Sequence, residues 1–444
     1  MSKAERIKAP RGTGDVLGEQ AGVRAVLEAS ARKILEGAGY TRIETPVLEA
    51  TELFARGVGE ATDIVQKEMF TLEDGGGRSL TLRPEGTAPV CRAYVEHGMH
   101  KRKQPVKLWY LSSFFRHERA QAGRYRQFWQ VGAEALGSDD PALDAESIVL
   151  LAALLDEMGV RGTRLRLSSL GGRESRGAYR ERLKAHLREH EASLSEEVKG
   201  RIELNPLRAF DSEHEGTKQV LASAPRLLDE LSAEDREHFG EVRDLLDAAE
   251  VAYEVDPTLV RGLDYYTRTV FEFTSDALGA QSGVGGGGRY DGLVEMLGGP
   301  PTAGIGWAAG VERILLAGEE LPVTASPIDL YVALGEDSGA GRQRGGEKDF
   351  NDVLTHAPAA RSSIRRAAFR LTNDARSAGL VVRMELAGRS LKGQLGYASA
   401  LGARYVAIVG SEGETVLKDM QGGGQERVAT DTVVHTVLRA LRTL

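Results

Sequence analysis

The spacing of apolar residues in the first third of the chain predicts a helix followed by strands. From Ala21 to Glu36 apolar residues recur at helical spacing, and residues 39–54 then change to an extended pattern punctuated by proline. Two strand-like runs follow, at 107–116 and 126–137, with a polar loop containing Gly123 between them. This arrangement predicts a long β-hairpin.

The middle of the chain has a different composition and periodicity. Residues from about 170 to 250 are charged and amphipathic with a helical period, which predicts a helical insertion. Strand patterns return at 254–273, followed by a glycine-dense stretch at 282–293. Residues 304–317 open with glycine and continue as a predicted helix, so the first domain resumes after the insertion.

The last third predicts a separate small α/β domain. After a linker-like stretch at 318–327, strand patterns at 328–334, 379–386 and 404–410 alternate with helical ones, one of them near 391–402, which favours a largely parallel sheet. Residues 336–360 are rich in glycine and polar side chains without a sustained period. We expect a mobile surface insertion there, with ordering on RNA as the alternative.

Composition narrows the class of protein. With 444 residues, 41% hydrophobic and 27% charged, the chain is expected to form two or three globular domains. The polar N-terminal stretch and the absence of a long apolar run argue against secretion and membrane insertion. One cysteine, Cys91, excludes an intramolecular disulfide and a zinc site built on cysteines. We expect a buried thiol in a cytoplasmic protein.

The net charge of −8 would not by itself attract nucleic acid. Any RNA binding must therefore use local basic clusters, of which 101–107 and 116–127 are the candidates. A cluster of this kind is equally well explained as a solvated face.

One predicted strand carries an unusual set of side chains. The alternation of a strand places Phe128, Gln130, Gly132 and Glu134 on one face. A carboxylate beside a glycine on an inner strand is costly to bury unless a ligand fills the gap and supplies a donor. The alternative is the solvent-exposed face of an edge strand.

Two arginines among apolar neighbours, Arg116 and Arg261, could bind phosphate or carboxylate oxygens through their paired donors, although a structural ion pair explains each one separately. The glycine-dense stretch at 282–292 could allow close approach to a ligand, but it lacks the Lys-Ser/Thr ending of a phosphate-binding loop. No His or Cys spacing indicates a metal site, and no serine elbow indicates acyl-enzyme chemistry.

Taken together, the chain resembles the class II aminoacyl-tRNA synthetases, and specifically the histidyl-tRNA synthetase family, over almost its whole length. The resemblance rests on seven ordered segments: PRGTGD (10–15), GYTRIETPVLE (39–49), TLRPEGT (81–87), FRHERAQAGRYRQFWQVGAE (115–134), LVRGLDYYTRTVFEF (259–273), GGGGRYDGL (285–293) and GIGWAAGVER (304–313). A chance match of seven segments in order is negligible, and the separate alternatives above lose most of their weight.

The resemblance implies a fold and a reaction. It implies an α/β protein with an antiparallel sheet flanked by helices in a catalytic domain at 1–325, a helical insertion at about 170–250, and an anticodon-binding α/β domain at 326–444. It also implies a homodimer formed around Pro46. The reaction it implies has two steps: the carboxylate of L-histidine attacks the α-phosphate of ATP, and the resulting histidyl-adenylate is transferred to tRNA(His).

The resemblance assigns roles to residues at matching positions. It implies that Arg116 and Arg261 act on the α-phosphate, that Arg313, Phe128 and Glu118 bind the rest of ATP, and that Mg²⁺ is held mainly by the triphosphate. In the histidine pocket, Glu134 and Tyr266 are expected to contact the imidazole. The full set implied to bind histidine is Glu85, Gly86, Thr87, Gln130, Glu134, Tyr265, Tyr266 and Tyr290.

Three departures and two alternatives remain. Ala120 and Trp129 stand where Pro and His are more usual in the family, and the stretch at 336–360 exceeds the usual length. Synthetase-like regulatory subunits that accompany ATP phosphoribosyltransferase keep the fold but usually lose the anticodon domain and the motif arginines. A tRNA-sensing module would normally be joined to a kinase domain. The arginines and the C-terminal domain of this chain favour the enzyme.

Overall fold

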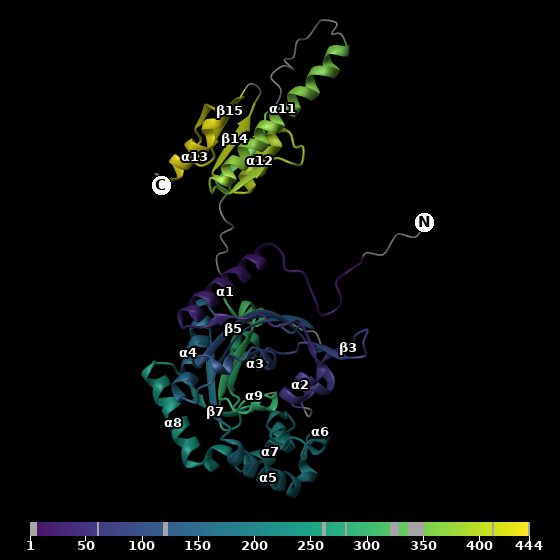
Figure 1. Ribbon diagram of the computed structural model, residues 1–444, viewed down its shortest axis with the longest axis vertical. Helices are drawn as coiled ribbons and strands as arrows, with labels where there is room; N and C mark the ends of the chain where they lie inside the picture. Colours follow the sequence, from purple (N-terminus) through teal and green to yellow (C-terminus); the bar gives the residue numbers. More distant parts are fainter. Residues whose placement is uncertain are drawn as a thin grey trace, which may run out of the picture. The chain divides into compact units, whose positions relative to one another are not determined.

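The computed structural model describes residues 7–59, 62–118, 123–259, 263–279, 282–319, 328–335, 350–410 and 413–442, with the backbone alone at 173–174 and 350–361. The chain divides into two compact units, Met1–Val323 and Thr324–Leu444, here called the N-terminal and C-terminal units (Figure 1).

An eight-stranded sheet forms the centre of the N-terminal unit. In spatial order its strands are β1 (Thr41–Arg42), β5 (Val106–Phe115), β6 (Gln127–Leu136), β11 (Gly304–Gly310), β10 (Gly283–Arg289), β9 (Thr267–Ser275), β7 (Thr163–Ser169) and β8 (Glu254–Val255). Neighbouring strands are antiparallel except for the outer pairs β1–β5 and β7–β8. A smaller sheet has the order β2 (Leu48–Ala50), β4 (Ser79–Leu82) and β3 (Phe70–Glu73). The expected antiparallel sheet flanked by helices is confirmed.

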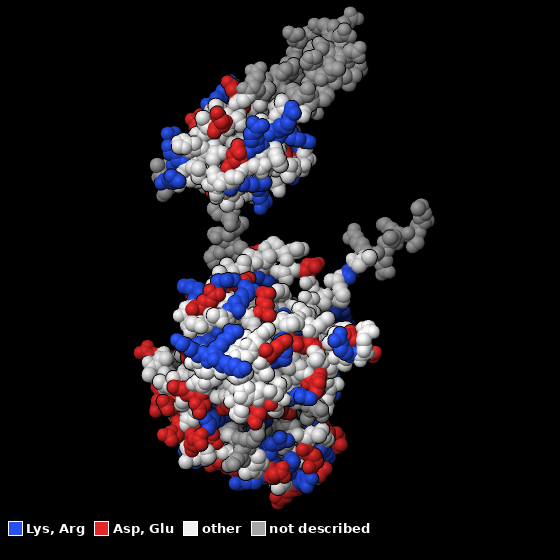
Figure 2. Space-filling view, in the orientation of Figure 1, with Lys and Arg blue, Asp and Glu red and all other residues white. Residues whose placement is uncertain are grey.

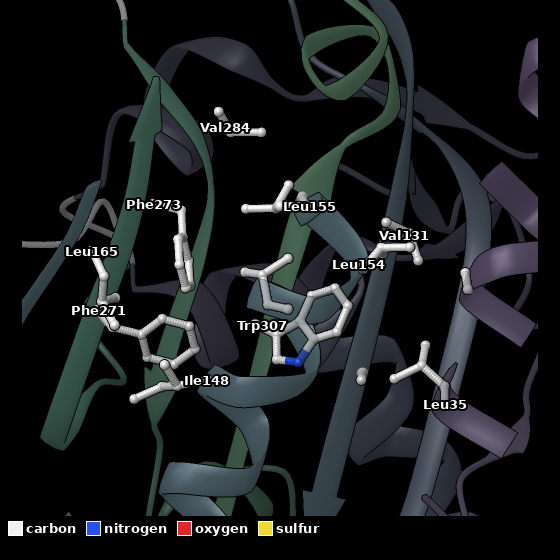
Figure 3. Close-up of a cluster of buried hydrophobic side chains, with 14 of the residues drawn as sticks. Leu35, Val131, Ile148, Leu154, Leu155, Leu165, Phe271, Phe273, Val284 and Trp307 are labelled. Atoms are coloured by element: carbon white, nitrogen blue, oxygen red, sulfur yellow. The ribbon is translucent and has the colours of Figure 1, made fainter. Parts of the chain in front are cut away.

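The longer helices of this unit are α1 (Gly18–Gly37), α2 (Thr51–Val58), α3 (Thr87–Glu96), α4 (Pro141–Glu157), α5 (Arg173–Glu189), α7 (Glu215–Ala222), α8 (Ala233–Ala248) and α10 (Val311–Ala317), with the short α6 (Glu196–Lys199) and α9 (Leu293–Met296). Helices α1, α4, α8 and α10 bury one face of the large sheet. Figure 3 shows Leu154 and Ile148 of α4 beside Trp307 and Phe271 of the sheet. The last helix of the predicted insertion, α8, thus belongs to this layer.

The opposite face of the sheet packs against α3, α9 and α5. Tyr94 of α3, Leu293 of α9 and Leu183 of α5 share a buried cluster with Tyr110 and Phe114 of β5. Helices α5, α6 and α7 lie together at one end of the unit (Figure 1). Cys91 is buried within α3, which confirms the expected buried thiol. The candidate site lies on this face.

Three predicted elements of the N-terminal unit need correction. The extended pattern at 39–54 ends at Ala50, and α2 begins at Thr51. In the described part of the pattern at 254–273, only 254–255 and 267–273 are strand. The segment at 304–317 is strand β11 up to Gly310 before α10 starts. Glycines in β10 and β11 allow the strands to lie close together, since a Cβ on Gly287 would be 1.9 Å from the carbonyl oxygen of Gly306.

The C-terminal unit has a five-stranded sheet in the order β13 (Val382–Met384), β12 (Leu330–Leu334), β14 (Tyr405–Val409), β15 (Glu414–Asp419) and β16 (Gln425–Ala429). Its helices are α11 (Phe350–Ser377), α12 (Leu391–Ala400) and α13 (Val433–Arg442). The first three strands are parallel, as predicted, but β14, β15 and β16 are antiparallel. The sheet is therefore mixed rather than largely parallel.

The predicted insertion at 336–360 falls partly outside the described residues, at 336–349. From Phe350 onward the prediction is wrong, because these residues form the first turns of α11. A helix that is anchored by buried residues such as Ile364 and Ala368 gains one hydrogen bond for each residue added at its end, so a polar segment can extend it. Within the described residues, no helix is long and apolar enough to cross a membrane.

Candidate active site

The β5–β6 hairpin forms one wall of the site and confirms the predicted hairpin. Phe128, Gln130 and Gly132 of β6 stand opposite Phe114, Ser112 and Tyr110 of β5. The alternate residues Val131, Ala133 and Ala135 point into the helical layer on the other face. Because β6 lies between β5 and β11, the alternative of an exposed edge strand is excluded.

A cavity of about 680 Å³ opens beside this hairpin. Its lining includes Arg116, Glu118, Arg124, Phe128, Gln130, Tyr266, Gly283 and Arg313. These residues come from segments far apart in the sequence, which the antiparallel sheet brings side by side.

Three guanidinium groups line the cavity. Arg116 donates through Nε to the carbonyl oxygen of Pro84 at 2.9 Å, and its Cζ lies 5.3 Å from the centre of the Phe128 ring. Arg313 donates through Nε to the carbonyl oxygen of Gly283. Arg124, which we did not predict, faces the same space. Burial, and after it the neighbouring Arg124, lower the pKa of Arg313.

Carboxylates also line the cavity and offset part of the charge of these arginines. Glu118 forms ion pairs with Arg116 at 3.8 Å and with Arg124 at 3.4 Å. Asp211 pairs with Arg208, Glu272 with Arg166, and Glu312 with Arg24. Glu272 also lies close enough to act on the pKa of Arg313. A polyphosphate would therefore meet three guanidinium groups together with the carboxylates of Glu118 and Glu272.

On β6 of the hairpin, Glu134 is completely buried, and each of its oxygens accepts a hydrogen bond. Its Oε1 accepts from the hydroxyl of Thr87 at 2.8 Å and its Oε2 from the hydroxyl of Tyr290 at 2.7 Å. The hydroxyl of Tyr110 lies 3.5 Å from Oε1. Burial raises the pKa of Glu134 to about 8.

The sequence predicted that a ligand fills the gap at Gly132, next to Glu134. The ring of Tyr110 fills this gap instead. A Cβ on Gly132 would lie 2.4 Å from the ring of Tyr110, and a Cβ on Gly86 would clash with the same ring. The two glycines thus make room for the tyrosine, which fills the space assigned to a ligand. Tyr110 is the buried residue that sequence reasoning missed, because only strand pairing places it opposite Gly132.

The side chain of Glu85 caps the N-terminus of α3. Its Oε2 accepts from the backbone N–H of Thr87 at 2.7 Å and its Oε1 from that of Ala88 at 2.9 Å. It therefore satisfies two backbone donors at the helix N-terminus. Burial raises its pKa.

The predicted tyrosines gather next to Glu134. The ring centres of Tyr265 and Tyr266 are 4.8 Å apart, and those of Tyr265 and Tyr290 are 5.8 Å apart. Gln130 and Tyr266 line the cavity. The Oε1 atom of Gln130 is buried and has no hydrogen-bond partner among the described residues, so it offers an acceptor to a ligand.

Residues 12–314 match the family model described as histidyl-tRNA synthetase. The chain belongs to the histidyl-tRNA synthetase family. A histidine–tRNA ligase of Halorhodospira halophila is 48% identical over 440 residues, which cover 98% of each chain. The structure of apo histidyl-tRNA synthetase from S. aureus is 33% identical, with a TM-score of 0.77, and the match covers 97% of this chain and 100% of that chain.

A more distant structure shares the fold alone. A protein of Bacillus halodurans described as ATP phosphoribosyltransferase regulatory subunit/histidyl-tRNA synthetase is 22% identical, with a TM-score of 0.60, over 90% of this chain and 97% of that chain. The fold by itself therefore does not separate the enzyme from the regulatory subunits, and the site residues must do so.

Of the residues that the synthetase resemblance pointed to, Arg261 lies outside the described residues, as does Ala120. Trp129 packs on the helical face of the sheet, with Arg24 5.8 Å from its ring centre, so its difference from the family pattern concerns packing.

Arg116 and Arg124 of the second basic cluster line the cavity, so this cluster is more than a solvated face. In the described part of the chain, no group of three His, Cys, Asp or Glu residues could hold a metal ion.

Proposed function

We propose that the chain is a histidine–tRNA ligase, which activates L-histidine with ATP and transfers it to tRNA(His). Its family uses ATP as a substrate. The observation that carries the proposal is that an arginine-lined cavity adjoins a buried carboxylate–tyrosine cluster on one face of the sheet. Gln130 lies in the cavity, and Glu134 lies two positions along the same strand face. The arginine-lined cavity suits ATP, which is a polyanion. The carboxylate–tyrosine cluster suits histidine, which carries an ammonium and an imidazole.

On the ATP side, Arg116 and Arg313 would stabilise the charge that builds up on the phosphate oxygens during in-line attack. We assign the α-phosphate to Arg116 and the γ-phosphate to Arg313. Phe128, which already lies beneath the Arg116 guanidinium, would stack on adenine, and Glu118 would accept from the adenine amino group. Arg261 remains a predicted second contact of the α-phosphate.

On the histidine side, the unpartnered Oε1 of Gln130 would accept from the ammonium group. Each oxygen of Glu134 has two lone pairs, so the carboxylate can accept the imidazole N–H in addition to its bonds with Thr87 and Tyr290. Tyr266 would bind the other imidazole nitrogen. Glu85, Gly86, Tyr265 and Tyr290 then shape the pocket and hold these groups in place.

Mg²⁺ prefers oxygen ligands and keeps several waters, and it is commonly bound through substrate phosphates. The described residues hold no group of three side chains suited to a metal, whereas the carboxylates of Glu118 and Glu272 line the cavity. We therefore propose that Mg²⁺ enters with ATP. Its chemistry there is to neutralise phosphate charge.

The partners follow from the same activity. We propose a homodimer formed around Pro46, with residues 1–325 as the catalytic domain and 326–444 as the anticodon-binding domain, acting in the cytoplasm where translation occurs. Figure 2 shows lysine and arginine side chains gathered locally among acidic ones on the visible face. With a net charge of −8, binding of tRNA would rely on such local groups and weaken as salt rises.

Histidine-dependent exchange of pyrophosphate into ATP tests the proposal, because it requires only the first step. A ligase exchanges pyrophosphate when histidine is present. A regulatory subunit of the same fold would show no exchange, and that result would reject the proposed function.

A further inference from the structure

The segment that carries Tyr265 and Tyr266 has little support from its own sheet. Residues 264–266 precede β9, which begins at Thr267, and belong to no strand. The backbone N–H of Asp264 makes one long hydrogen bond, 3.3 Å, to the carbonyl oxygen of Val58. Something outside the sheet must therefore fix the carbonyls on either side of Tyr265.

A guanidinium from the helical insertion does so. Arg176 lies in the first turn of α5, and its Nη1 donates to the carbonyl oxygen of Asp264 at 2.8 Å and to that of Tyr266 at 2.7 Å. One charged donor thus bridges the two carbonyls that flank Tyr265. Hydrogen bonds from a charged donor are stronger than those between neutral groups.

Other residues of the insertion hold the same segment. The Nδ2 of Asn205, just before the short helix Pro206–Asp211, donates to Oδ1 of Asp264 at 2.6 Å. On the other side of the tyrosines, Arg268 adopts a φ of 42°, an uncommon backbone conformation for a residue with a side chain. Its Nε donates to Oδ1 of Asp235 on α8 at 3.1 Å, and its backbone N–H donates to the carbonyl oxygen of Gly171 at 2.9 Å.

We propose that Arg176 is a positioning residue for the amino-acid pocket, through which the helical insertion sets the affinity for histidine. This inference rests on the proposed function, since it takes Tyr265 and Tyr266 to be part of the histidine pocket. Among the described residues, Arg176 contacts the tyrosine segment and none of the arginines that line the cavity, so a change at Arg176 acts on histidine more than on ATP.

The same helix supplies a matched control. Arg180 lies one turn further along α5, and its Nη2 donates to the carbonyl oxygen of Leu204 at 2.8 Å. Arg180 therefore also binds a carbonyl through its guanidinium, but the acceptor lies within the insertion. Loss of Arg180 tests the stability of the insertion without touching residues 264–266.

The test is steady-state pyrophosphate exchange by the full chain, with histidine and ATP varied in turn, together with thermal unfolding. Arg176→Ala is expected to raise the KM for histidine by about tenfold or more while the KM for ATP changes by less than about twofold. Arg176→Lys, which keeps a cationic donor, should recover part of the lost affinity. Arg180→Ala should leave both KM values unchanged.

A folded Arg176→Ala variant with the wild-type KM for histidine would overturn the inference, as would equal rises in the two KM values. If Arg176→Ala does not fold, Arg176→Gln decides in the same way, because its neutral amide cannot place a cation between the two carbonyls. Absence of histidine-dependent exchange in the wild-type chain would instead reject the proposed function, so the two failures are distinguishable.

Discussion

The hydroxyl of Tyr290 donates to Oε2 of Glu134 at 2.7 Å in the interior of the N-terminal unit. Neither side chain has appreciable contact with solvent, and Glu134 is completely buried. The bond joins β6 to the residue that follows β10, two strands away in the sheet. The carboxylate is therefore held in place before any ligand arrives, as a pocket that selects by hydrogen bonding requires.

Glu134→Gln keeps the shape of this side chain but replaces one acceptor oxygen by a donor. The hydroxyls of Thr87 and Tyr290 and the imidazole N–H would then compete for fewer acceptors, so we expect the KM for histidine to rise and kcat to fall, by about tenfold or more in kcat/KM. The KM for ATP should stay near the wild-type value. A variant that loses ATP affinity and keeps its histidine affinity would place Glu134 on the nucleotide side.

The same residue predicts a pH dependence of stability. Because burial raises the pKa of Glu134 to about 8 in the protein without histidine, the folded protein retains a proton that the unfolded chain loses above its ordinary pKa of 4.5. An imidazole N–H that donates to Glu134 would favour the ionised form. The contribution of this group is therefore most favourable below pH 4.5 and is lost as the pH rises towards 8, at up to about 1.4 kcal/mol per pH unit. Between pH 5 and 8, Glu134→Gln should show a flatter dependence of unfolding free energy in denaturant titrations. Parallel curves for the two proteins would contradict this.

Arg116 is expected to act on the reaction more than on the fold. Its Nε contacts a single backbone carbonyl, and the rest of the guanidinium faces the cavity. Arg116→Ala should slow adenylate formation in a single turnover by about a hundredfold or more, with a small change in melting temperature. Arg78→Ala is a suitable control, since Arg78 is exposed and pairs with Asp74 away from the cavity. Near-normal single-turnover adenylation by Arg116→Ala would show that Arg116 is not a catalytic residue.

Gly132 and Gly240 form a matched pair of glycines. A Cβ on Gly132 would lie 2.4 Å from the ring of Tyr110, whereas a Cβ on Gly240 in α8 would meet no atom within 4 Å. Gly132→Ala should destabilise the protein by about 1–3 kcal/mol through overpacking and impair histidine binding. Gly240→Ala should stabilise it by about 0.5–1 kcal/mol, because alanine is the better helix former. Similar melting temperatures for the two variants would show that Tyr110 has room to move.

The sequence predicted those parts of the fold that depend on local periodicity. The alternation along β6 correctly placed Phe128, Gln130 and Glu134 on one face, and glycine and polar residues marked the hairpin loop. It failed where a glycine-rich strand has no apolar alternation of its own, as in β10 and the first half of the segment at 304–317. It also failed for the antiparallel strands β15 and β16, whose polar residues gave no strand signal.

Contacts between residues of different strands and helices could not be predicted from the sequence. Tyr110 fills the gap at Gly132 only because β5 pairs with β6 in one particular register. Arg176 looks like one more charged residue of an amphipathic helix until the fold brings it to the carbonyls of Asp264 and Tyr266. Such contacts depend on tertiary packing rather than on local pattern, and no spacing in the sequence encodes them.

The measurement that tests the central claim most directly is pyrophosphate exchange into ATP by the full chain, with each amino acid supplied in turn. Exchange with L-histidine should stand well above the level seen with the other amino acids. The side chain of any other amino acid would leave buried polar groups of the pocket beside Glu134 and Gln130 without hydrogen-bond partners. Arg116→Ala should lower this exchange by about a hundredfold or more. Exchange that does not depend on histidine, or its absence in the wild-type protein, would contradict the assignment of this cavity as a histidine-activating site.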